Sequence, residues 1–400
     1  MKSFSMTLAT AVLLSGCSNQ PDWTKQQKEQ ANDRWTGARA QVICAVGFEH
    51  FKSGDLDQAA GKAAEALAID PAHLGAHVLM GKVLLEKGRY AEASGVLDVA
   101  GGQAPDNPEI AFLKGVALEK LGQLDECLKF YQHARALDPA NDAYVVAEAE
   151  ALVSGGKPQL ALELLETRME RFEADATMLG LAGEIAMLVG DPQRAAVHYR
   201  RCLDAQPKSL QVREALGKAH FFAGQYDEAL DVLAVLAEHE KYNRKAAWVY
   251  VMMGDAAMAT NKPVEARRFY ETVTVIEPED AKGWVCLAKA AMAAQNASTA
   301  ILAARRALAL APDSAEATIV LGYTLLSQGR GAEAIIVLAP AAEKDPDQPV
   351  LQCALGRCYE AAGRTDRAIA CYTRALRADP ENPLAKGLMA SAGLAAGEVR

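Results

Sequence analysis

The sequence predicts an all-α protein, an α-solenoid of ten helix–turn–helix units, and three observations support this prediction. Half of the 400 residues are apolar and 23% are charged, so the chain can bury a core along its length. Aromatic residues make up only 6% and alanine is abundant, which suits close packing of helices better than β-sandwiches. Small residues and prolines recur every 34 residues from Ala40 onward, and such a period is the signature of a repeat array.

The first residues have the features of a targeting signal. Lys2 precedes an apolar stretch over 4–14 that is too short to span a bilayer as a permanent helix. The stretch ends in Leu14-Ser15-Gly16-Cys17, which resembles the lipobox of bacterial lipoproteins. This resemblance implies that residues 1–16 are a removed signal peptide and that Cys17 carries the lipids at the mature N-terminus. The alternatives are an ordinary secretory signal and a buried apolar start.

Residues 17–39 are expected to form the lipidated N-terminus and a polar tether, because the segment is rich in Gln, Lys and Asp. Several acyl chains would anchor it stably, since each buried CH₂ contributes about 0.8 kcal/mol. Ser18 follows the cysteine, where the enterobacterial rule places Asp in lipoproteins kept at the inner membrane. We therefore expect a lipid-anchored protein of the bacterial cell envelope, at the outer membrane facing the periplasm rather than at the inner membrane.

Four columns define the repeat, counted in units of 34 residues from Ala40 with three extra residues in the sixth unit. The twentieth place is Ala or Cys in every unit, and the thirty-second place is Pro in eight of the ten. The eighth place holds small residues: Gly47, Gly81, Gly115, Ala149, Gly183, Gly217, Gly254, Ala288, Gly322 and Gly356. The fifteenth place holds Gly54, Gly88, Gly122, Gly156, Gly190, Gly224, Asn261, Gln295, Gly329 and Gly363.

Each column has a physical reason that places the two helices of a unit. The fifteenth-place residue ends the first helix, because glycine forms a left-handed C-cap without a Cβ clash and Asn261 tolerates it too. A small eighth residue lets the second helix approach, and the small twentieth residue is the matching surface. The proline ends the second helix and sets the turn into the next unit. Residues 383–400 are expected to form a capping helix, as the end of an array needs.

The pattern resembles the tetratricopeptide repeat, since four columns agree at once over residues 40–382. The resemblance implies ten units that wind into a right-handed solenoid. The fourth unit lacks the closing proline and has Arg168 where a small residue is usual. The sixth unit also lacks the proline, has Leu236 in the corresponding place and carries the insertion around 243–245. Irregular, loosened joints are therefore expected near 165–176 and 236–247.

No catalytic motif is present, and we expect a protein that is not an enzyme and that has no cofactor. The Gly-Lys pairs, such as Gly217-Lys218, lack the Ser or Thr that follows in a phosphate-binding loop. The chain also lacks the metalloprotease and serine-hydrolase motifs. The net charge of −9 argues against a nucleic-acid partner, because such proteins show a basic face.

The histidines and cysteines give no strong metal or redox signal. His73 and His77 are four residues apart but straddle a proline turn, so surface histidines are a better interpretation than a metal site. Cys353, Cys358 and Cys371 lie in the last unit, where a disulfide outside the cytoplasm is permitted but not required.

The resemblance also implies a partner-binding groove, lined by the second, fifth, ninth and twelfth places of the first helices. The stripe is apolar and rich in Met, with both signs of charge, and it suits a peptide or an amphipathic helix. Phe221 is the expected anchor, beside Phe222. The alternative is that these residues only pack neighbouring units together. The residues expected to line the groove are Phe48, Phe51, Phe112, Met187, Lys218, Phe221, Asp255, Met258, Lys289, Met292 and Tyr323.

These features favour a noncatalytic scaffold or adaptor that holds other envelope proteins or peptides in this groove. The layout is similar to that of lipoproteins that help to assemble pili, secretion channels or outer-membrane proteins. Two alternatives stay open: a scaffold lipoprotein of exopolysaccharide export, and a regulatory partner of a separate glycosyltransferase.

Overall fold

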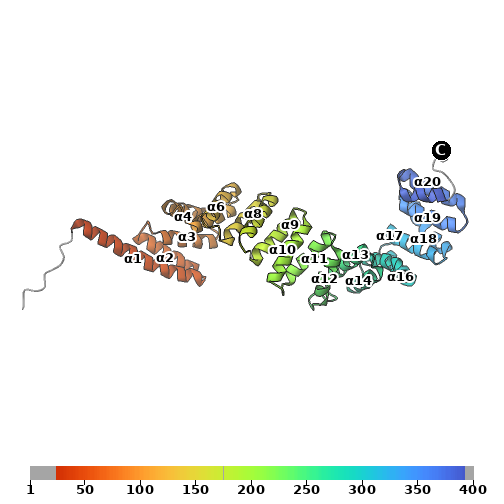
Figure 1. Ribbon diagram of the computed structural model, residues 1–400, viewed down its shortest axis with the longest axis horizontal. Coiled ribbons are helices and arrows are strands. Elements are labelled where there is room, and N and C mark those ends of the chain that lie inside the picture. Colours follow the sequence, from red (N-terminus) through yellow and green to blue (C-terminus); the bar gives the residue numbers. More distant parts are fainter. Residues whose placement is uncertain (1–23, 174, 392–400) are drawn as a thin grey trace, which may run out of the picture. The chain divides into compact units, whose positions relative to one another are not determined.

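The computed structural model describes residues 24–173 and 175–391, and it confirms the all-α prediction. Within these ranges there are twenty-one helices joined by short turns, and there is no strand (Figure 1). The chain divides into two compact units, residues 1–174 and 175–400. The boundary falls in the range 165–176, where the sequence predicts a joint. Residues 1–23, which include the predicted signal peptide and Cys17, lie outside the described residues, as do 392–400.

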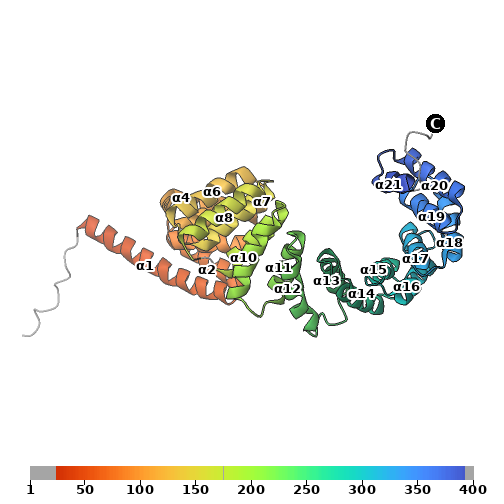
Figure 2. The same cartoon turned by 45° about the vertical axis from the view of Figure 1, so that its right-hand side comes forward.

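The first unit holds four repeats, each a pair of adjacent helices (Figure 2). α1 differs from the other first helices, because its 28 residues include a long extension before the first repeat. The predicted polar tether is therefore helical from Lys25 onward. The helices are α1 (Lys25–Lys52), α2 (Leu56–Ile69), α3 (Leu74–Glu86), α4 (Tyr90–Gln103), α5 (Pro108–Lys120), α6 (Leu124–Leu137), α7 (Asp142–Ser154) and α8 (Pro158–Arg171).

The second unit holds six repeats and a terminal helix. That last helix, α21, packs on α19 and α20 and buries Ala385 and Met389, so it covers the end of the tenth repeat. The helices are α9 (Ala176–Leu188), α10 (Pro192–Ala205), α11 (Leu210–Phe222), α12 (Tyr226–Glu238), α13 (Ala247–Ala259), α14 (Pro263–Ile276), α15 (Ala281–Ala293), α16 (Ala297–Leu310), α17 (Ala315–Ser327), α18 (Gly331–Lys344), α19 (Pro349–Ala361), α20 (Thr365–Ala378) and α21 (Pro383–Ser391).

The turn inside each repeat has the left-handed backbone that the fifteenth column predicts. All eight glycines of that column have positive φ, and so do Asn261 (58°) and Gln295 (57°). Glycine adopts this conformation without a steric penalty, whereas a residue with a Cβ loses roughly 1 kcal/mol there. The column therefore records a backbone requirement that each of the ten repeats meets.

The glycine in the eighth place makes room for a large side chain of the second helix. A Cβ on Gly115 would lie 2.5 Å from Cε1 of Tyr131, and a Cβ on Gly183 would lie 2.6 Å from Cε1 of Tyr199. Leucine fills the same position in three other repeats. The residue that fits against the small eighth residue is thus the twenty-fourth. The twentieth-place residues, which were expected to be that matching surface, are fully buried in all ten repeats.

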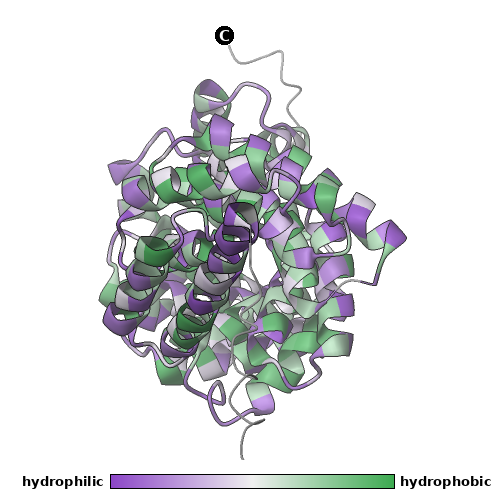
Figure 3. Cartoon of the chain, turned by 90° about the vertical axis from the view of Figure 1, so that its left-hand side faces the viewer, coloured by the Kyte–Doolittle hydropathy of each residue, from purple (hydrophilic) through white to green (hydrophobic). Residues whose placement is uncertain are grey.

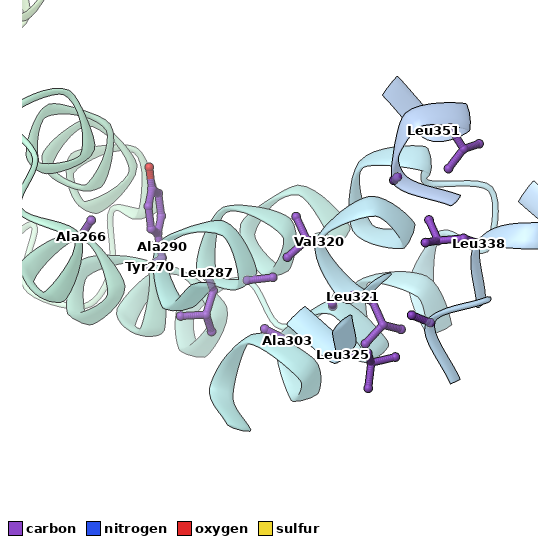
Figure 4. Close-up of a cluster of buried hydrophobic side chains, with 14 of the residues drawn as sticks. Ala266, Tyr270, Leu287, Ala290, Ala303, Val320, Leu321, Leu325, Leu338 and Leu351 are labelled. Carbon is purple, nitrogen blue, oxygen red and sulfur yellow. The ribbon is translucent and has the colours of Figure 1, made fainter. Parts of the chain in front are cut away.

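The core continues from each repeat into the next. In the second unit one large cluster of buried side chains extends from α13 to α20, and Figure 4 shows its side chains from Ala266 to Leu351. Hydrophobic and hydrophilic residues alternate around the helices, so each presents an apolar side to its neighbours (Figure 3). First helices of successive repeats also touch directly, as α15 touches α17 and α17 touches α19.

The fourth repeat accommodates its unusual arginine by pairing it. Arg168 is buried, and its Nη2 lies 2.5 Å from Oδ1 of Asp142 and 3.2 Å from the carbonyl oxygen of Ala140. Its guanidinium also lies 3.9 Å from the centroid of the Phe172 ring. Asp142 and Phe172 belong to the fourth repeat, and Ala140 lies in the turn just before it, so all these contacts of the arginine are internal to the first unit. The looseness of this joint stays a prediction.

The described residues include no helix that is both long and apolar enough to cross a bilayer.

Candidate binding surface on the first helices

In the first helices of the second unit, the ninth and twelfth places are half-buried or exposed throughout, whereas the fifth place is half-buried in α9, α11, α13 and α17 and buried in α15 and α19. The second and thirteenth places lie on the same side of each helix as these three, because each residue advances a helix by about 100°. Aromatic, apolar and charged side chains come together here on α9, α11, α13 and the insertion before α13. We call this the α9–α13 surface, made of Met187, Leu188, Glu214, Lys218, Phe221, Phe222, Tyr242 and Trp248.

Glu214 is the centre of the charged part of this surface. Its Oε1 accepts a hydrogen bond from Nζ of Lys218 at 2.6 Å, and its Oε2 accepts one from the hydroxyl of Tyr242 at 3.0 Å. Nζ of Lys218 also lies 4.6 Å from the centroid of the Trp248 ring, which is a cation–π distance. One carboxylate and one ammonium group thus join α11, the insertion and α13.

The environment of Glu214 keeps its carboxyl group ionised. Burial by itself would raise the pKa of Glu214, but the hydrogen bonds from Lys218 and Tyr242 and the nearby positive charges outweigh burial. The pKa of Glu214 therefore lies below its usual value. A partner at neutral pH meets a fixed negative charge beside a fixed positive charge, and such a pair can orient a ligand.

The insertion of the sixth repeat supplies Tyr242. Its side chain is buried, and its ring meets the ring of Trp248 edge to face with centroids 6.2 Å apart. The hydroxyl of Tyr250 accepts the N–H of Arg244 at 3.1 Å and fixes the same segment from α13. The insertion is therefore packed against α13, and the looseness of the joint near 236–247 stays a prediction.

Apolar side chains at the ends of α9 and α11 form a ridge beside these charges. Leu188 and Phe222 occupy the thirteenth place of neighbouring repeats, and they are 62% and 63% exposed. Phe221 is half-buried, and its ring packs on the rings of Phe222 and Tyr226 with centroids 5.6 Å apart in both pairs. Phe221 thus supports Phe222, which is the more exposed of the two rings.

A small hollow lies next to the ridge. Its volume is about 260 Å³, which suits one side chain of a partner rather than a drug-sized ligand. It is lined by Met187, Tyr199, Gln211, Glu214, Ala215 and Lys218. The hollow therefore offers both apolar and charged contacts to whatever enters it.

Two predicted polar residues of the groove are held by neighbouring side chains. Asp255 is exposed and accepts a hydrogen bond from the hydroxyl of Tyr270 at 2.5 Å, which ties α13 to α14. Lys289 forms an ion pair with Glu316, which ties α15 to α17. Both remain on the solvent side, so they extend the charged pattern of the α9–α13 surface along the same unit.

Three further predicted residues of the second unit are only partly available to a partner. Met258 and Tyr323 are half-buried and pack against the core cluster that extends from α13 to α20. The guanidinium of Arg357 lies 5.8 Å from the ring centroid of Tyr323 and covers part of it. Met292 is exposed at the end of α15. Of these three side chains, Met292 is therefore the most accessible to a partner.

The remaining predicted residues belong to the first unit. Phe48 and Phe51 are half-buried against the core of the first two repeats, and Nζ of Lys82 lies 5.8 Å from the Phe48 ring centroid. Phe112 packs between Tyr131 and Tyr144, with ring centroids 5.7 Å and 5.1 Å away. Much of each of these three rings is thus used in packing between helices, as the alternative interpretation of the groove residues expects.

Five members of the surface are not among the residues predicted to line the groove: Leu188, Glu214, Phe222, Tyr242 and Trp248. Trp248 is the one aromatic residue in the second column of the repeat, so that column read by itself would have singled it out. Glu214 stands in the fifth column among mostly apolar residues. Tyr242 carries no such signal, because the insertion has no counterpart in the other repeats.

The described residues offer little for catalysis or metal binding. They contain no group of three or more His, Cys, Asp or Glu that could hold a metal ion. Nδ1 of His73 accepts the N–H of Ala76 at 3.1 Å and caps α3, and its Nε2 lies 3.0 Å from Oε1 of Gln41. The seven described cysteines are free thiols. Burial raises the pKa of Cys353 and of Cys358 to about 11, so both stay protonated at neutral pH.

Three profiles of the tetratricopeptide repeat match this chain. One matches residues 50–117, 186–241 and 325–392, a second matches 146–210 and 286–349, and a third matches 108–141. Together they cover more than half of the chain. The chain therefore belongs to the tetratricopeptide repeat family. Members of this family are scaffolds for interactions between proteins and are not catalysts.

Two curated tetratricopeptide relatives match part of the chain. They are tetratricopeptide repeat protein 21A of Mus musculus, 23% identical over 262 residues, and tetratricopeptide repeat protein 21B of Xenopus laevis, 23% identical over 254 residues. Each match covers 58% of this chain and 19% of the relative, so the chain spans about a fifth of their length.

Solved tetratricopeptide structures show a likeness to part of the chain as well. MamA is 22% identical with a TM-score of 0.38, and the match covers 42% of this chain and 95% of MamA. YrrB, described as a tetratricopeptide protein with an unusual peptide-binding site, is 17% identical with a TM-score of 0.40, and the match covers 49% of this chain and 98% of YrrB.

Proposed function

We propose that this tetratricopeptide protein is a noncatalytic scaffold of the bacterial cell envelope that binds protein partners on the α9–α13 surface. The observation that carries the proposal is the exposure of Phe222 and Leu188 beside the ion pair of Glu214 and Lys218. Large apolar side chains that cluster on a surface next to fixed charges are typical of interaction sites.

The chemistry of the surface suits a peptide or an amphipathic helix with one apolar side. Covering Phe222 and Leu188 would supply most of the affinity, because aromatic anchors dominate such interfaces. The charges of Glu214 and Lys218 would fix the direction of the partner. Met187 lines the adjoining hollow, and its flexible side chain can adapt to partners of irregular shape.

The location in the envelope is proposed from residues 1–17. A short apolar stretch that ends in Leu14-Ser15-Gly16-Cys17 supports lipidation of Cys17 after removal of residues 1–16. A scaffold held on a lipid anchor would keep its partners near the membrane, as assembly of a pilus, a secretion channel or an outer-membrane complex requires. The outer membrane, facing the periplasm, is the proposed site.

The surface can be tested by crosslinked affinity purification from native envelopes. Phe222→Ala and Trp248→Ala should weaken the capture of specific partners, and loss of one aromatic anchor costs about 2 kcal/mol, roughly thirtyfold in affinity. Leu302→Ala is the matched control, because Leu302 is 62% exposed on the second helix α16. Equal recovery of every partner with all variants would contradict the proposal.

The anchor needs a separate test. Cys17→Ala should abolish labelling with a metabolic fatty acid and should leave the chain either soluble or with its signal uncleaved. The wild-type chain should be labelled and recovered with membranes. Membrane retention of the unlabelled variant at the wild-type level would contradict the lipid anchor.

A further inference from the structure

Within the described residues, the N-terminal end of the first unit exposes an apolar helix face. Val42 occupies the third place of the first repeat, and in the next three repeats this place packs on the second helix of the repeat before it, through Ala76, Ile110 and Tyr144. Those three residues are buried, whereas Val42 is 65% exposed. Because terminal repeats need a polar outer face to stay in solution alone, an exposed valine here indicates that something covers it.

The extension of α1 continues the same apolar face. α1 has 28 residues, whereas α3, α5 and α7 have 13 each. On the side opposite the buried Ala40 and Cys44, apolar residues follow one another at intervals of four, three, four and three residues. This is the spacing of the contact seam between two paired helices. The seam, here called the α1 stripe, consists of Ala31, Trp35, Ala38, Val42 and Ala45.

The α1 stripe is exposed at every member except Ala31, which is half-buried. Trp35 is 63% exposed, and the guanidinium of Arg39 lies 5.7 Å from the centroid of its ring. The alanines of the stripe would let a second helix approach closely, and the stripe from Ala31 to Ala45 is about 21 Å long. The stripe is narrow and three of its five residues are alanine, so it would bury little apolar area in a lipid surface, and this favours a second helix as the occupant.

We propose that the α1 stripe pairs with the same stripe of a second copy of this chain, with the two α1 helices antiparallel. When the pair is centred between residues 36 and 37, Trp35 faces Ala38 of the second copy and Ala31 faces its Val42. Each large side chain then meets an alanine. The extension of each copy covers the open end of the first repeat of the other, where a preceding repeat would otherwise lie. The interface is two-fold symmetric, as most homodimer interfaces are.

The charges around the α1 stripe fit this pairing. In this register Lys28 lies one turn from Glu49 of the second copy, so the ends of the pair carry opposite charges. The arginines that flank the stripe face neutral amides, Arg34 with Gln41 and Arg39 with Asn32. No like-charged side chains of the helix segment 25–49 face each other across the seam. The pairing uses only the first unit, so it is independent of the α9–α13 surface.

Sedimentation velocity of the detergent-solubilised full-length chain tests the dimer. The particle should change from one chain to two as the protein concentration rises, and Trp35→Ala should raise the dissociation constant at least tenfold. Leu302→Ala is the control, because Leu302 is 62% exposed but belongs to the second unit and to neither proposed surface. Both variants should keep the wild-type circular dichroism. A chain that stays monomeric at every concentration, or a dimer that Trp35→Ala leaves unchanged, would overturn the proposal.

Engineered disulfides test the orientation. The double variant Ala31→Cys with Val42→Cys should give a covalent dimer on oxidation, while either single variant and the native chain should not. The two positions cannot bridge within one helix, because eleven residues of rise separate them by about 16 Å. A covalent dimer from Ala31→Cys alone would show a parallel pair and would overturn the antiparallel arrangement. Binding of a monomer to vesicles that depends on Trp35 would assign the stripe to the membrane instead.

Discussion

The fit between Gly115 and Tyr131 makes an unusual prediction for a helical glycine. Gly115→Ala would gain about 1 kcal/mol from helix propensity alone. The added Cβ, however, would lie 2.5 Å and 2.6 Å from two ring carbons of Tyr131, about 1 Å inside an ordinary contact. Tyr131 is fully buried and donates a hydrogen bond to Oε2 of Glu119 at 2.6 Å, so its ring cannot move aside freely.

The net effect of Gly115→Ala should therefore be a loss of stability. Overpacking of a buried site costs about 1–3 kcal/mol, and Tyr131 is held at both ends, so the upper part of that range applies. After the gain in propensity, the free energy of unfolding should fall by about 1–2 kcal/mol. Gly95 is the matched control within the same unit, because it lies inside α4 and nothing stands within 4 Å of its missing Cβ. Gly95→Ala should raise stability by up to about 1 kcal/mol.

The chain itself suggests a compensating change. The fourth repeat has Ala149 and Leu165 in the places of Gly115 and Tyr131, and both are fully buried. Adding Tyr131→Leu to Gly115→Ala should therefore restore part of the loss, with a coupling energy of at least about 1 kcal/mol. Urea unfolding followed by circular dichroism measures all four chains of the cycle. Stabilisation by Gly115→Ala, or costs that simply add, would refute the proposed fit.

Three further predictions concern buried and charged groups. Asp142→Ala leaves the buried guanidinium of Arg168 without its carboxylate and should lower the unfolding free energy by about 3 kcal/mol, whereas Arg168→Met should be nearly neutral; equal costs in urea unfolding would contradict this. The pKa values of Cys353 and Cys358 are about 11, so only a small fraction of either thiol is ionised at pH 8. Both should react with a thiol reagent roughly two hundred times more slowly in the folded chain than in the urea-unfolded chain. Similar rates in the two states would disprove their burial. Because the pKa of Glu214 is lowered in the folded chain, its ionised carboxyl group stabilises the fold above the usual carboxyl pKa, and this stabilisation is lost as the pH falls through the lowered value. Glu214→Gln should therefore flatten the decline of the unfolding free energy below about pH 4. An unchanged decline would argue against this role of Glu214.

The fold could be predicted from the sequence because each structural requirement is repeated ten times. The left-handed turn at Asn261 and Gln295 was recognisable even without glycine, since eight other repeats have glycine in the same column. The same repetition over ten units made the buried twentieth column and the first helices predictable. The large side chain opposite the eighth place was harder to find, because Tyr, Leu and Ala all occur there and their common role appears only when the two helices are placed together.

The candidate site was less predictable because it depends on departures from the repeat. Tyr242 lies in an insertion without a counterpart, so no column reports that it is buried against Trp248. Phe221 and Phe222 are neighbours in the chain, and only packing on Tyr226 decides which ring remains exposed. The extension of α1 was expected as a polar tether from its composition. Composition hides the α1 stripe, since a few apolar residues on one side of a helix are outnumbered by the polar residues around them.

The central claim is that partners bind on the open side of the first helices. A photo-crosslinking amino acid at position 222, with the same probe at position 302 as control, tests this claim most directly in living cells. Both native side chains are exposed to nearly the same extent, 63% and 62%, but they lie on a first helix and a second helix respectively. The account predicts discrete crosslinked proteins from position 222 that Trp248→Ala diminishes, with few or none from position 302. The same products from both positions, or products that Trp248→Ala leaves unchanged, would contradict it.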